Sequence, residues 1–268
     1  MSLQKSIKLS LVNFLSEDSK NEINQLNDSL RLLCKWRSLL ITNTYIQKCG
    51  VGIFQGPFKD MQFLNQSSEG CHMAKLFGTY EQPLHKYIEE IVSTKYETIF
   101  NIGSAEGYYS VGLAMRMQTT KILSFDINDA AQKACIELAK KNNVSKSIEV
   151  FGEFHPELVN SHENEKCLIL CDVEGEENRL LDVANYPALI KFDILVESHD
   201  CFKPGITQEL VNRFSPTHQI IIINDNGQRN LDVQPEWFLQ FSHLDQLLAV
   251  WEWRSGPTPW IFMKSLHN

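Results

Sequence analysis

The sequence predicts an α/β fold in which a mostly parallel sheet lies between two layers of helices. From residue 76 onward, short apolar runs typical of buried strands alternate with segments whose apolar residues recur at helical spacing. Such alternation is typical of βαβ units, which build parallel sheets with helices on both faces. Hydrophobic residues make up 43% of the 268 residues and charged residues 22%, which is enough apolar material for a sizeable core.

The predicted strands follow one another at intervals that leave room for a helix between most of them. They cover residues 98–102, 122–125, 148–151, 167–171, 194–197, 219–223 and 259–263. Among the helices, one carries an apolar stripe from Leu84 to Ile91 with Pro83 in its first turn, and another is capped by Asn128. A further helix is expected near residues 236–248.

The first 75 residues have a different pattern. Apolar residues recur at helical spacing, which predicts an amphipathic helix, at Ile23, Leu26, Leu30, Leu33 and Leu40. Glycines and a proline between residues 50 and 57 then predict a hairpin or an irregular loop. We therefore divide the chain into an N-terminal helical and hairpin extension, residues 1–75, and a main domain, residues 76–268. The extension is expected to pack on the main domain or to cover part of it.

Charge and cysteine usage restrict the class of protein. The formal net charge of -8 disfavours a general nucleic-acid binder, which normally presents a basic surface to phosphates. The N-terminus lacks the apolar core of a signal peptide, and no apolar run approaches the ~18 residues that span a bilayer. The seven scattered cysteines indicate reduced thiols and a cytoplasmic protein, with Cys167 and Cys171 packed on one face of a buried strand.

A cofactor site is expected beyond the carboxyl ends of the strands, where parallel sheets bind ligands. Gly103 and Gly107 follow the first strand and permit a tight turn that brings backbone amides to a ligand at a helix N-terminus. Their GxxxG spacing, with Ser104 between them, differs from the GxGxxG of dinucleotide sites and favours a nucleoside without a pyrophosphate. The alternative is a turn with a purely structural role.

Asp126 ends the second strand and is followed by Ile127. A carboxylate at this place can accept hydrogen bonds from both ribose hydroxyls of a nucleoside. A helix-capping or solvated aspartate is the alternative. The turn and the acid together indicate a nucleoside site more strongly than either does alone.

These residues carry a family resemblance. The run from Asn101 to Ala114, with Asp126 after it, resembles motifs I and II of class I AdoMet-dependent methyltransferases. The stretches CDVEGEE at 171–177 and LVESHD at 195–200 resemble the D-x-E-G-x-E and V-E-x-H motifs of the FkbM-type branch. The resemblance covers about residues 76–225. It implies a Rossmann-like three-layer sandwich, a seven-stranded sheet with a reversed last strand, AdoMet as the cofactor and O-methylation as the commonest chemistry.

The resemblance also implies a set of cofactor contacts. Many members carry an acid where Asn101 stands, and we hypothesise that Glu106 supplies the missing charge to the methionyl ammonium. Gly152 and Glu153, after the third strand, are expected near the adenine. The full expected set is Asn101, Gly103, Ser104, Glu106, Gly107, Asp126, Ile127, Gly152, Glu153 and Asp172.

Methyl transfer to a hydroxyl needs a base that removes the hydroxyl proton. Candidates end the fourth and fifth strands, at Asp172, Glu174, Glu197, His199 and Asp200. His199 is the preferred base because imidazole titrates near neutral pH, and Asp172 or Glu197 is the expected carboxylate that orients it. A structural histidine is the alternative. Glu176 and Glu177 are interpreted as first-turn acids favoured by a helix dipole, without a catalytic role.

Other readings of these residues stay open. Asp172, Glu174 and His199 could bind a divalent metal, which we do not expect to be needed. A nicotinamide-dependent oxidoreductase and a non-catalytic AdoMet-binding module are the rival functions. Tryptophans near the C-terminus, Trp251, Trp253 and Trp260, could stack on a sugar, although core packing is favoured. The expected acceptor is a small-molecule or glycan hydroxyl, and the sequence leaves open whether the chain forms a homodimer.

Overall fold

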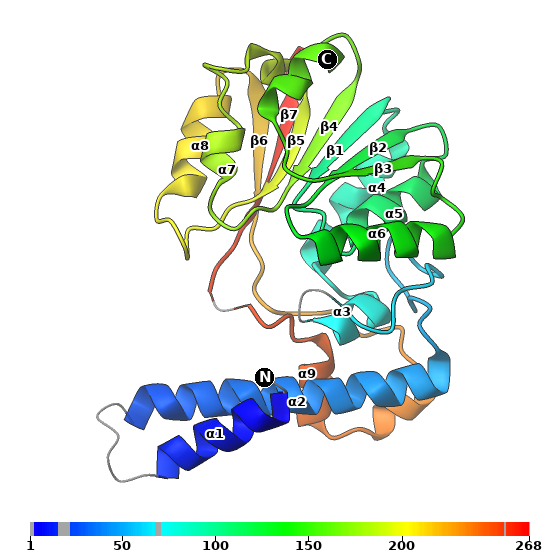
Figure 1. The fold of residues 1–268 in the computed structure, drawn as a ribbon, viewed down its shortest axis with the longest axis vertical. Helices are drawn as coiled ribbons and strands as arrows, with labels where there is room; N and C mark the ends of the chain where they lie inside the picture. Colours follow the sequence, from blue (N-terminus) through cyan, green and yellow to red (C-terminus); the bar gives the residue numbers. More distant parts are fainter. Residues whose placement is uncertain (1–2, 16–21, 68–70, 255, 268) are drawn as a thin grey trace.

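The computed structural model describes residues 3–15, 22–67, 71–254 and 256–267, and its centre is a seven-stranded sheet (Figure 1). The strands, in chain order, are β1 (Thr98–Ile102), β2 (Lys121–Phe125), β3 (Ile148–Phe151), β4 (Cys167–Cys171), β5 (Asp193–Glu197), β6 (His218–Ile223) and β7 (Trp260–Ser265). Their order across the sheet is β3-β2-β1-β4-β5-β7-β6. Neighbouring strands are parallel except that β7 runs antiparallel to both β5 and β6. This confirms the predicted Rossmann-like sheet with a reversed last strand.

Helices cover both faces of the sheet. Helices α4 (His85–Ser93), α5 (Tyr108–Arg116) and α6 (Asp129–Lys141) lie on one face, and α7 (Glu177–Leu180) and α8 (Ile206–Phe214) lie on the other (Figure 1). Strands β1, β4 and β5 are buried at every position, as expected of central strands in such a sandwich. Cys167 and Cys171 both pack in the core on the α8 side, which confirms their predicted place.

Side-chain alternation along the strands builds two cores, one on each face. In β1, Ile99 faces the α4–α6 side and Phe100 faces the α8 side. The same division separates Leu195 from Ile194 in β5. Burying such side chains contributes about 1.5–3 kcal/mol each. The strand register is therefore strongly specified, because a slip of one residue would exchange the two faces.

The helix starts follow their capping residues. The Asn128 side chain accepts a hydrogen bond from the Ala130 amide at 2.9 Å, which confirms that residue as the cap of α6. The helix predicted near residues 236–248 is instead a 3₁₀ turn at Glu236–Gln240 followed by α9 (His243–Val250). The break arises because the Ser242 hydroxyl caps a new helix by accepting a bond from the Asp245 amide.

The N-terminal helices α1 (Leu3–Leu15) and α2 (Glu22–Cys49) form a helical base together with α9 (Figure 1). Arg37 of α2 makes a two-pronged ion pair with Asp245 of α9, at 2.6 and 2.7 Å. The buried face of α2 carries Ser38, Ile41 and Tyr45 rather than the predicted stripe. Because α9 belongs to the C-terminal part of the chain, the boundary at residue 75 stays a prediction.

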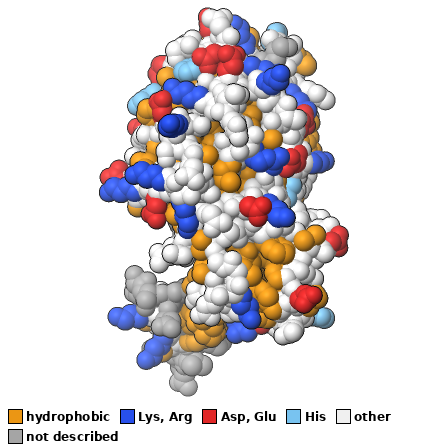
Figure 2. All heavy atoms as spheres, turned by 90° about the vertical axis from the view of Figure 1, so that its right-hand side faces the viewer, with side chains coloured by type: hydrophobic (Ala, Val, Ile, Leu, Met, Phe, Trp, Pro, Cys, Tyr) orange, Lys and Arg blue, Asp and Glu red, His pale blue; other side chains and the backbone are white. Residues whose placement is uncertain are grey.

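The predicted apolar stripe of α2 is exposed. Ile23 is 73% exposed and Leu30 61%, and α9 adds Leu244 and Leu247 at 62% and 67%. Figure 2 shows such hydrophobic side chains gathered on the lower part of the molecule. Beyond α2, the region predicted as a hairpin or irregular loop is joined by one antiparallel bridge between Gly52 and Gln62, before α3 (His72–Phe77). Within the described ranges, no helix is both long and apolar enough to cross a membrane.

Candidate active site

Polar residues that follow four parallel strands meet at the carboxyl edge of the sheet, where two cavities adjoin. The first, of about 310 Å³, lies beside the ends of β1, β2 and β3, and we call it the nucleoside cavity. The second, of about 340 Å³, lies beside the ends of β4 and β5, and its lining includes Lys35 of α2; we call it the acceptor cavity. Asp172 and Glu174, which follow β4, line both cavities.

The nucleoside cavity contains many of the predicted cofactor residues. Those in its lining are Gly103, Asp126, Ile127, Gly152, Glu153 and Asp172. Phe125 and Phe154 add aromatic surface. The other predicted residues, Asn101, Ser104, Glu106 and Gly107, are buried in and behind the turn that follows β1.

The turn after β1 requires glycine at two positions. Gly103 has φ 77°, and a Cβ there would lie 1.7 Å from the Asp172 carbonyl oxygen. Gly107 has φ 89°, and a Cβ there would lie 2.6 Å from Cys135 Sγ. Both conformations belong to the left-handed region that glycine adopts without strain. The glycines therefore let β1, β4 and α6 approach one another closely behind the nucleoside cavity.

Asp126 ties this turn to the start of α6. Its Oδ2 accepts a hydrogen bond from the Ala105 amide at 2.8 Å, and its Oδ1 accepts one from the Asn128 amide at 2.8 Å. The side chain is half-buried and lines the nucleoside cavity. Each carboxylate oxygen has a second lone pair that can accept a further bond. Binding of ribose hydroxyls by Asp126 is compatible with these contacts and stays a prediction.

Two buried side-chain oxygens beside the turn have no hydrogen-bond partner among the described residues. Asn101, 1% exposed, donates from Nδ2 to Ser110 Oγ at 2.7 Å, and its Oδ1 has no partner. Ser104 Oγ is likewise buried and has no hydrogen-bond partner among the described residues. Because buried polar atoms are nearly always paired, two such atoms in one turn suggest a site for a polar ligand. These residues therefore fit the polar methionyl end of AdoMet.

Glu106, predicted to supply a negative charge to the cofactor, forms a buried ion pair with Lys75. The distance from Lys75 Nζ to Glu106 Oε1 is 2.6 Å, and Ser67 Oγ donates to the same oxygen at 2.7 Å. Burial opposes ionisation of this carboxyl, but the charge of Lys75 outweighs it and holds the pKa of Glu106 at about 2. The charge of Glu106 is thus balanced within the protein, and its predicted contact with the methionyl ammonium stays untested.

Replacing Glu106 with glutamine is expected to lower the free energy of unfolding by about 3–5 kcal/mol, because Lys75 would keep a buried charge without its counter-ion. Lys75→Met is the matched variant, since it removes the same pair and leaves the carboxyl in place. Thermal unfolding measures the first effect, and titration with S-adenosylhomocysteine (SAH) measures cofactor affinity. A loss of affinity confined to Glu106→Gln would support the predicted cofactor role, and equal affinity of the two variants would reject it.

His199 lies at the floor of the acceptor cavity and is positioned by Glu177. Its Nδ1 is 2.6 Å from Glu177 Oε1, and Glu177 is fully buried. Glu177 is a first-turn acid of α7, as interpreted, and its carboxylate also contacts His199, which that interpretation did not include. Glu176 is exposed and pairs with Arg179 at 2.6 Å. Glu176, the N-cap of α7, is exposed, whereas Glu177 at the first helical position is buried, and composition alone does not distinguish the two. The last glutamate of the D-x-E-G-x-E motif was the available signal.

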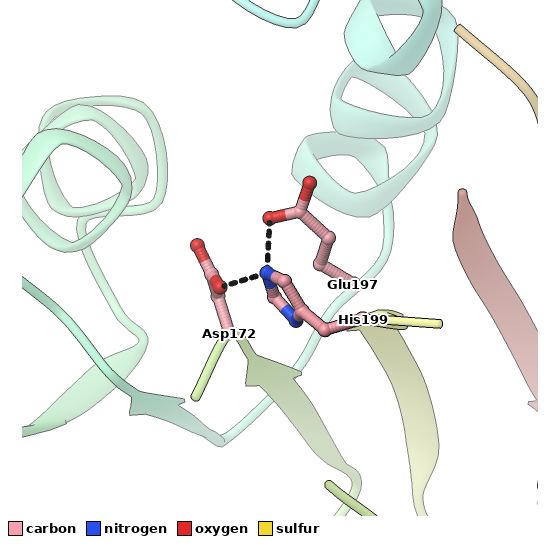
Figure 3. A group of neighbouring side chains, drawn as sticks. All are labelled: Asp172, Glu197 and His199. Atoms are coloured by element: carbon pink, nitrogen blue, oxygen red, sulfur yellow. Dashed lines mark ion pairs between the residues drawn. The ribbon is translucent and has the colours of Figure 1, made fainter. Parts of the chain in front are cut away.

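The other ring nitrogen of His199 faces two carboxylates. Figure 3 shows Asp172 and Glu197 directed toward Nε2, at 3.5 and 3.6 Å. These distances exceed a hydrogen bond, so Glu177, rather than Asp172 or Glu197, holds the ring. In a neutral ring, the tautomer that donates from Nδ1–H to Glu177 Oε1 leaves the lone pair on Nε2, the nitrogen that faces Asp172 and Glu197.

Charges around His199 favour its protonated form. Burial alone would lower the pKa of this imidazole, but the hydrogen bond to Glu177 and the charges of Glu197, Glu177 and Glu174 outweigh it and raise the pKa above its usual value. A raised pKa makes Nε2 a stronger proton acceptor. It also means that the unprotonated form becomes available only toward higher pH.

Glu197 is shared between His199 and an arginine network. Arg254 contacts Glu197 Oε1, and it also pairs with Glu81 at 2.7 Å and Glu252 at 3.2 Å. Burial and the charge of Glu197 raise the pKa of Glu81 to about 7 against the opposing effect of Arg254. This network joins the segment before α4 to residues 251–254 along the wall of the acceptor cavity.

Asp172, Glu197 and His199 also form a group able to hold a metal ion. Each offers a ligand atom, and these atoms lie within 4.8 Å of one another. Glu174, the expected second carboxylate of a metal site, is exposed, and Glu197 takes its place in this group. If His199 acts as a base, EDTA is expected to leave methyl transfer unchanged within about twofold. Loss of turnover with EDTA and its recovery with Mg²⁺ or Mn²⁺ would contradict that expectation.

Comparison with known proteins finds likenesses in structure only. No family model matches the chain, and no curated protein matches it. Solved structures similar to the chain include a candidate O-methyltransferase from Klebsiella pneumoniae, at 8% identity and TM-score 0.49, with 98% of each chain covered. An O-methyltransferase from Bacillus cereus in complex with SAH matches at 10% identity and TM-score 0.40, over 98% of this chain and 90% of that one.

An rRNA methylase from Streptococcus thermophilus matches at 10% identity and TM-score 0.46, over 68% of this chain and 96% of that one. The similar structures thus include methyltransferases with different kinds of acceptor. All three TM-scores are below 0.5.

Proposed function

We propose that the chain is an AdoMet-dependent methyltransferase that methylates a hydroxyl group of a small molecule or a sugar. The observation that carries this proposal is the junction of the two cavities at Asp172. A turn and an acid suited to a nucleoside line one cavity, and a histidine whose Nε2 faces Asp172 and Glu197 lines the other.

The sheet supports AdoMet over a nicotinamide cofactor. The dinucleotide-binding sheet has the strand order 3-2-1-4-5-6, whereas here an antiparallel β7 lies between β5 and β6. The turn after β1 has GxxxG spacing, and its buried Asn101 and Ser104 oxygens suit the amino-acid end of AdoMet rather than a pyrophosphate. The relation to the FkbM-type branch rests on the two sequence motifs and is part of the proposal.

Bound AdoMet would supply an electrophilic methyl group for a one-step displacement. The protein then has to hold the acceptor oxygen in line, which can provide roughly 7–11 kcal/mol of the barrier reduction. His199 Nε2 takes the proton of the acceptor hydroxyl, and Glu177 keeps the ring in the required tautomer and orientation. Asp172, at the junction of the cavities, lies beside both reactants.

Substitution of Glu177 by glutamine is expected to shift the pH dependence of methyl transfer. Removing the negative charge lowers the pKa of His199, so the acidic limb of the rate profile moves to lower pH. Its plateau falls, by about tenfold, because the amide no longer enforces the tautomer. Glu176→Gln, which alters an exposed neighbour, is the matched control and is expected to leave the profile in place. An unchanged acidic limb in Glu177→Gln would exclude the proposed pairing.

Calorimetric titration with AdoMet and SAH tests the proposed function, together with mass spectrometry of acceptors incubated with methyl-deuterated AdoMet. The proposal predicts one bound cofactor per chain and transfer of the labelled methyl group to a hydroxyl. Binding of AdoMet without transfer to any acceptor would favour the non-catalytic module. Tight binding of a nicotinamide nucleotide in place of SAH would favour the oxidoreductase.

A further inference from the structure

Trp253 has an unusual conformation at the wall of the acceptor cavity. It is a non-glycine residue in the left-handed backbone region, with φ 63°. Such a conformation costs of order 1–3 kcal/mol and persists where the surroundings enforce it. Trp253 lines the acceptor cavity together with Tyr80 and Phe202, so the strained residue faces the place of the second substrate.

Helix α2 holds Trp253 in this position. Arg31 donates hydrogen bonds to the carbonyl oxygens of Trp253 and Arg254, the latter at 3.5 Å. Lys35 Nζ lies 4.8 Å from the centre of the Trp253 ring, and the Trp251 ring is 6.1 Å away on the same segment. Packed in this way, the indole ring is fixed before any acceptor binds, which reduces the entropy lost on binding.

The Trp253 indole N–H lacks a hydrogen-bond partner among the described residues although its nitrogen is shielded from solvent. Tryptophan N–H groups that are buried usually find an acceptor atom. Leaving such a donor unpaired costs about 1–3 kcal/mol. A ligand that offers an oxygen at this place would recover that free energy.

The charges that line the acceptor cavity disfavour an anionic ligand. Its carboxylates, Asp172, Glu174, Glu197 and Glu252, outnumber its cations, Lys35 and Arg254. Arg254 is already paired with Glu81, Glu197 and Glu252, and Lys35 lies over the Trp253 ring. Hydroxyl groups, in contrast, can donate to the carboxylates. A volume of about 340 Å³ is at the small end of ligand pockets, which span about 300–1,000 Å³.

We propose that Trp253 recognises the acceptor and that this acceptor is an uncharged sugar ring. The Nε1–H at the edge of the indole ring donates to a ring oxygen or hydroxyl of the sugar, and the carboxylates accept from other hydroxyls. Phe202, stacked on His199 with ring centres 5.6 Å apart, adds a second apolar surface near the base. This inference rests on the proposed function and specifies its acceptor class.

Saturation-transfer NMR on the full chain saturated with SAH tests this assignment, with methyl α-glucopyranoside and glucose 6-phosphate as probes. The proposal predicts transfer to the ring protons of the glycoside and weaker binding of the phosphate ester. Trp253→Phe keeps an aromatic ring and removes the N–H, and should raise the Kd of the glycoside by about five- to tenfold. Trp36→Phe is the matched control, since Trp36 is exposed and lies outside the lining of the acceptor cavity, and its Kd should equal that of wild type.

Three results would overturn the inference: no glycoside binding by the wild-type protein, equal binding by Trp253→Phe, or tighter binding of glucose 6-phosphate. Thermal unfolding of both variants checks that a changed Kd does not reflect loss of the fold. SAH binding by the wild-type protein is measured first. A failure there would reject the proposed function itself, whereas SAH binding without glycoside binding would reject only the sugar acceptor.

Discussion

Gly103→Ala is expected to lower the free energy of unfolding by about 2–6 kcal/mol and to remove measurable SAH binding. The new Cβ would lie 1.7 Å from the Asp172 carbonyl oxygen, and the residue would have to keep a φ of 77°. Relief requires the turn after β1 to move away from β4, which changes the nucleoside cavity. Thermal unfolding should show a decrease of about 10 °C in the midpoint.

Gly152→Ala is the matched control for this prediction. Gly152 lines the same nucleoside cavity, but its φ is not positive and the nearest atom to an added Cβ is Gln132 Nε2 at 3.9 Å. This variant should unfold within a few degrees of wild type. A Gly103→Ala protein with wild-type stability and SAH affinity would show that the turn does not need glycine.

His199→Ala is expected to lower the rate of methyl transfer by about 10²–10⁴-fold, the usual contribution of a positioned general base. SAH affinity should stay within about twofold of wild type, because His199 lines the acceptor cavity and is absent from the lining of the nucleoside cavity. Release of SAH in the presence of methyl glycosides measures the rate. His243→Ala, an exposed histidine at the start of α9, controls for loss of a histidine elsewhere.

A rate for His199→Ala within threefold of wild type would assign His199 a structural role. Glu177→Gln separates positioning from base catalysis, since it retains the imidazole and changes its charge environment. If His199 and Glu177 act as a unit, His199→Ala should lose rate and Glu177→Gln should shift the pH profile.

The positions of the strands, and the edge of the sheet that carries the candidate site, were predictable from local sequence. Apolar runs located β1 and β4 at the residues found, because central strands of a sandwich are buried on both faces. The bounds of β3, an edge strand of which only Ile148 is buried, were also predicted. Residues directly after parallel strands share one edge of the sheet. The sequence alone therefore placed Asp126, Asp172 and His199 at the same edge. The Asn128 cap is equally local, since it depends on a bond across two residues.

What could not be predicted depends on contacts between distant segments. Lys75 reaches Glu106 from α3, and Lys35 reaches the acceptor cavity from α2. Helix periodicity identified α2 but assigned its buried face wrongly, because Ile41 and Tyr45 pack where the predicted stripe was expected. Glu177 was missed because a helix dipole explains an acid there equally well, and only the direction of its side chain separates the two roles.

A crystal of the protein soaked with SAH tests the central claim most directly, namely that the turn at Gly103–Gly107 and Asp126 form a nucleoside site. SAH is expected in the nucleoside cavity with both ribose hydroxyls within about 3 Å of the Asp126 carboxylate. Polar contacts from the ligand to Asn101 Oδ1 or Ser104 Oγ are also expected. An empty cavity at saturating SAH, or SAH bound elsewhere on the chain, would contradict that claim.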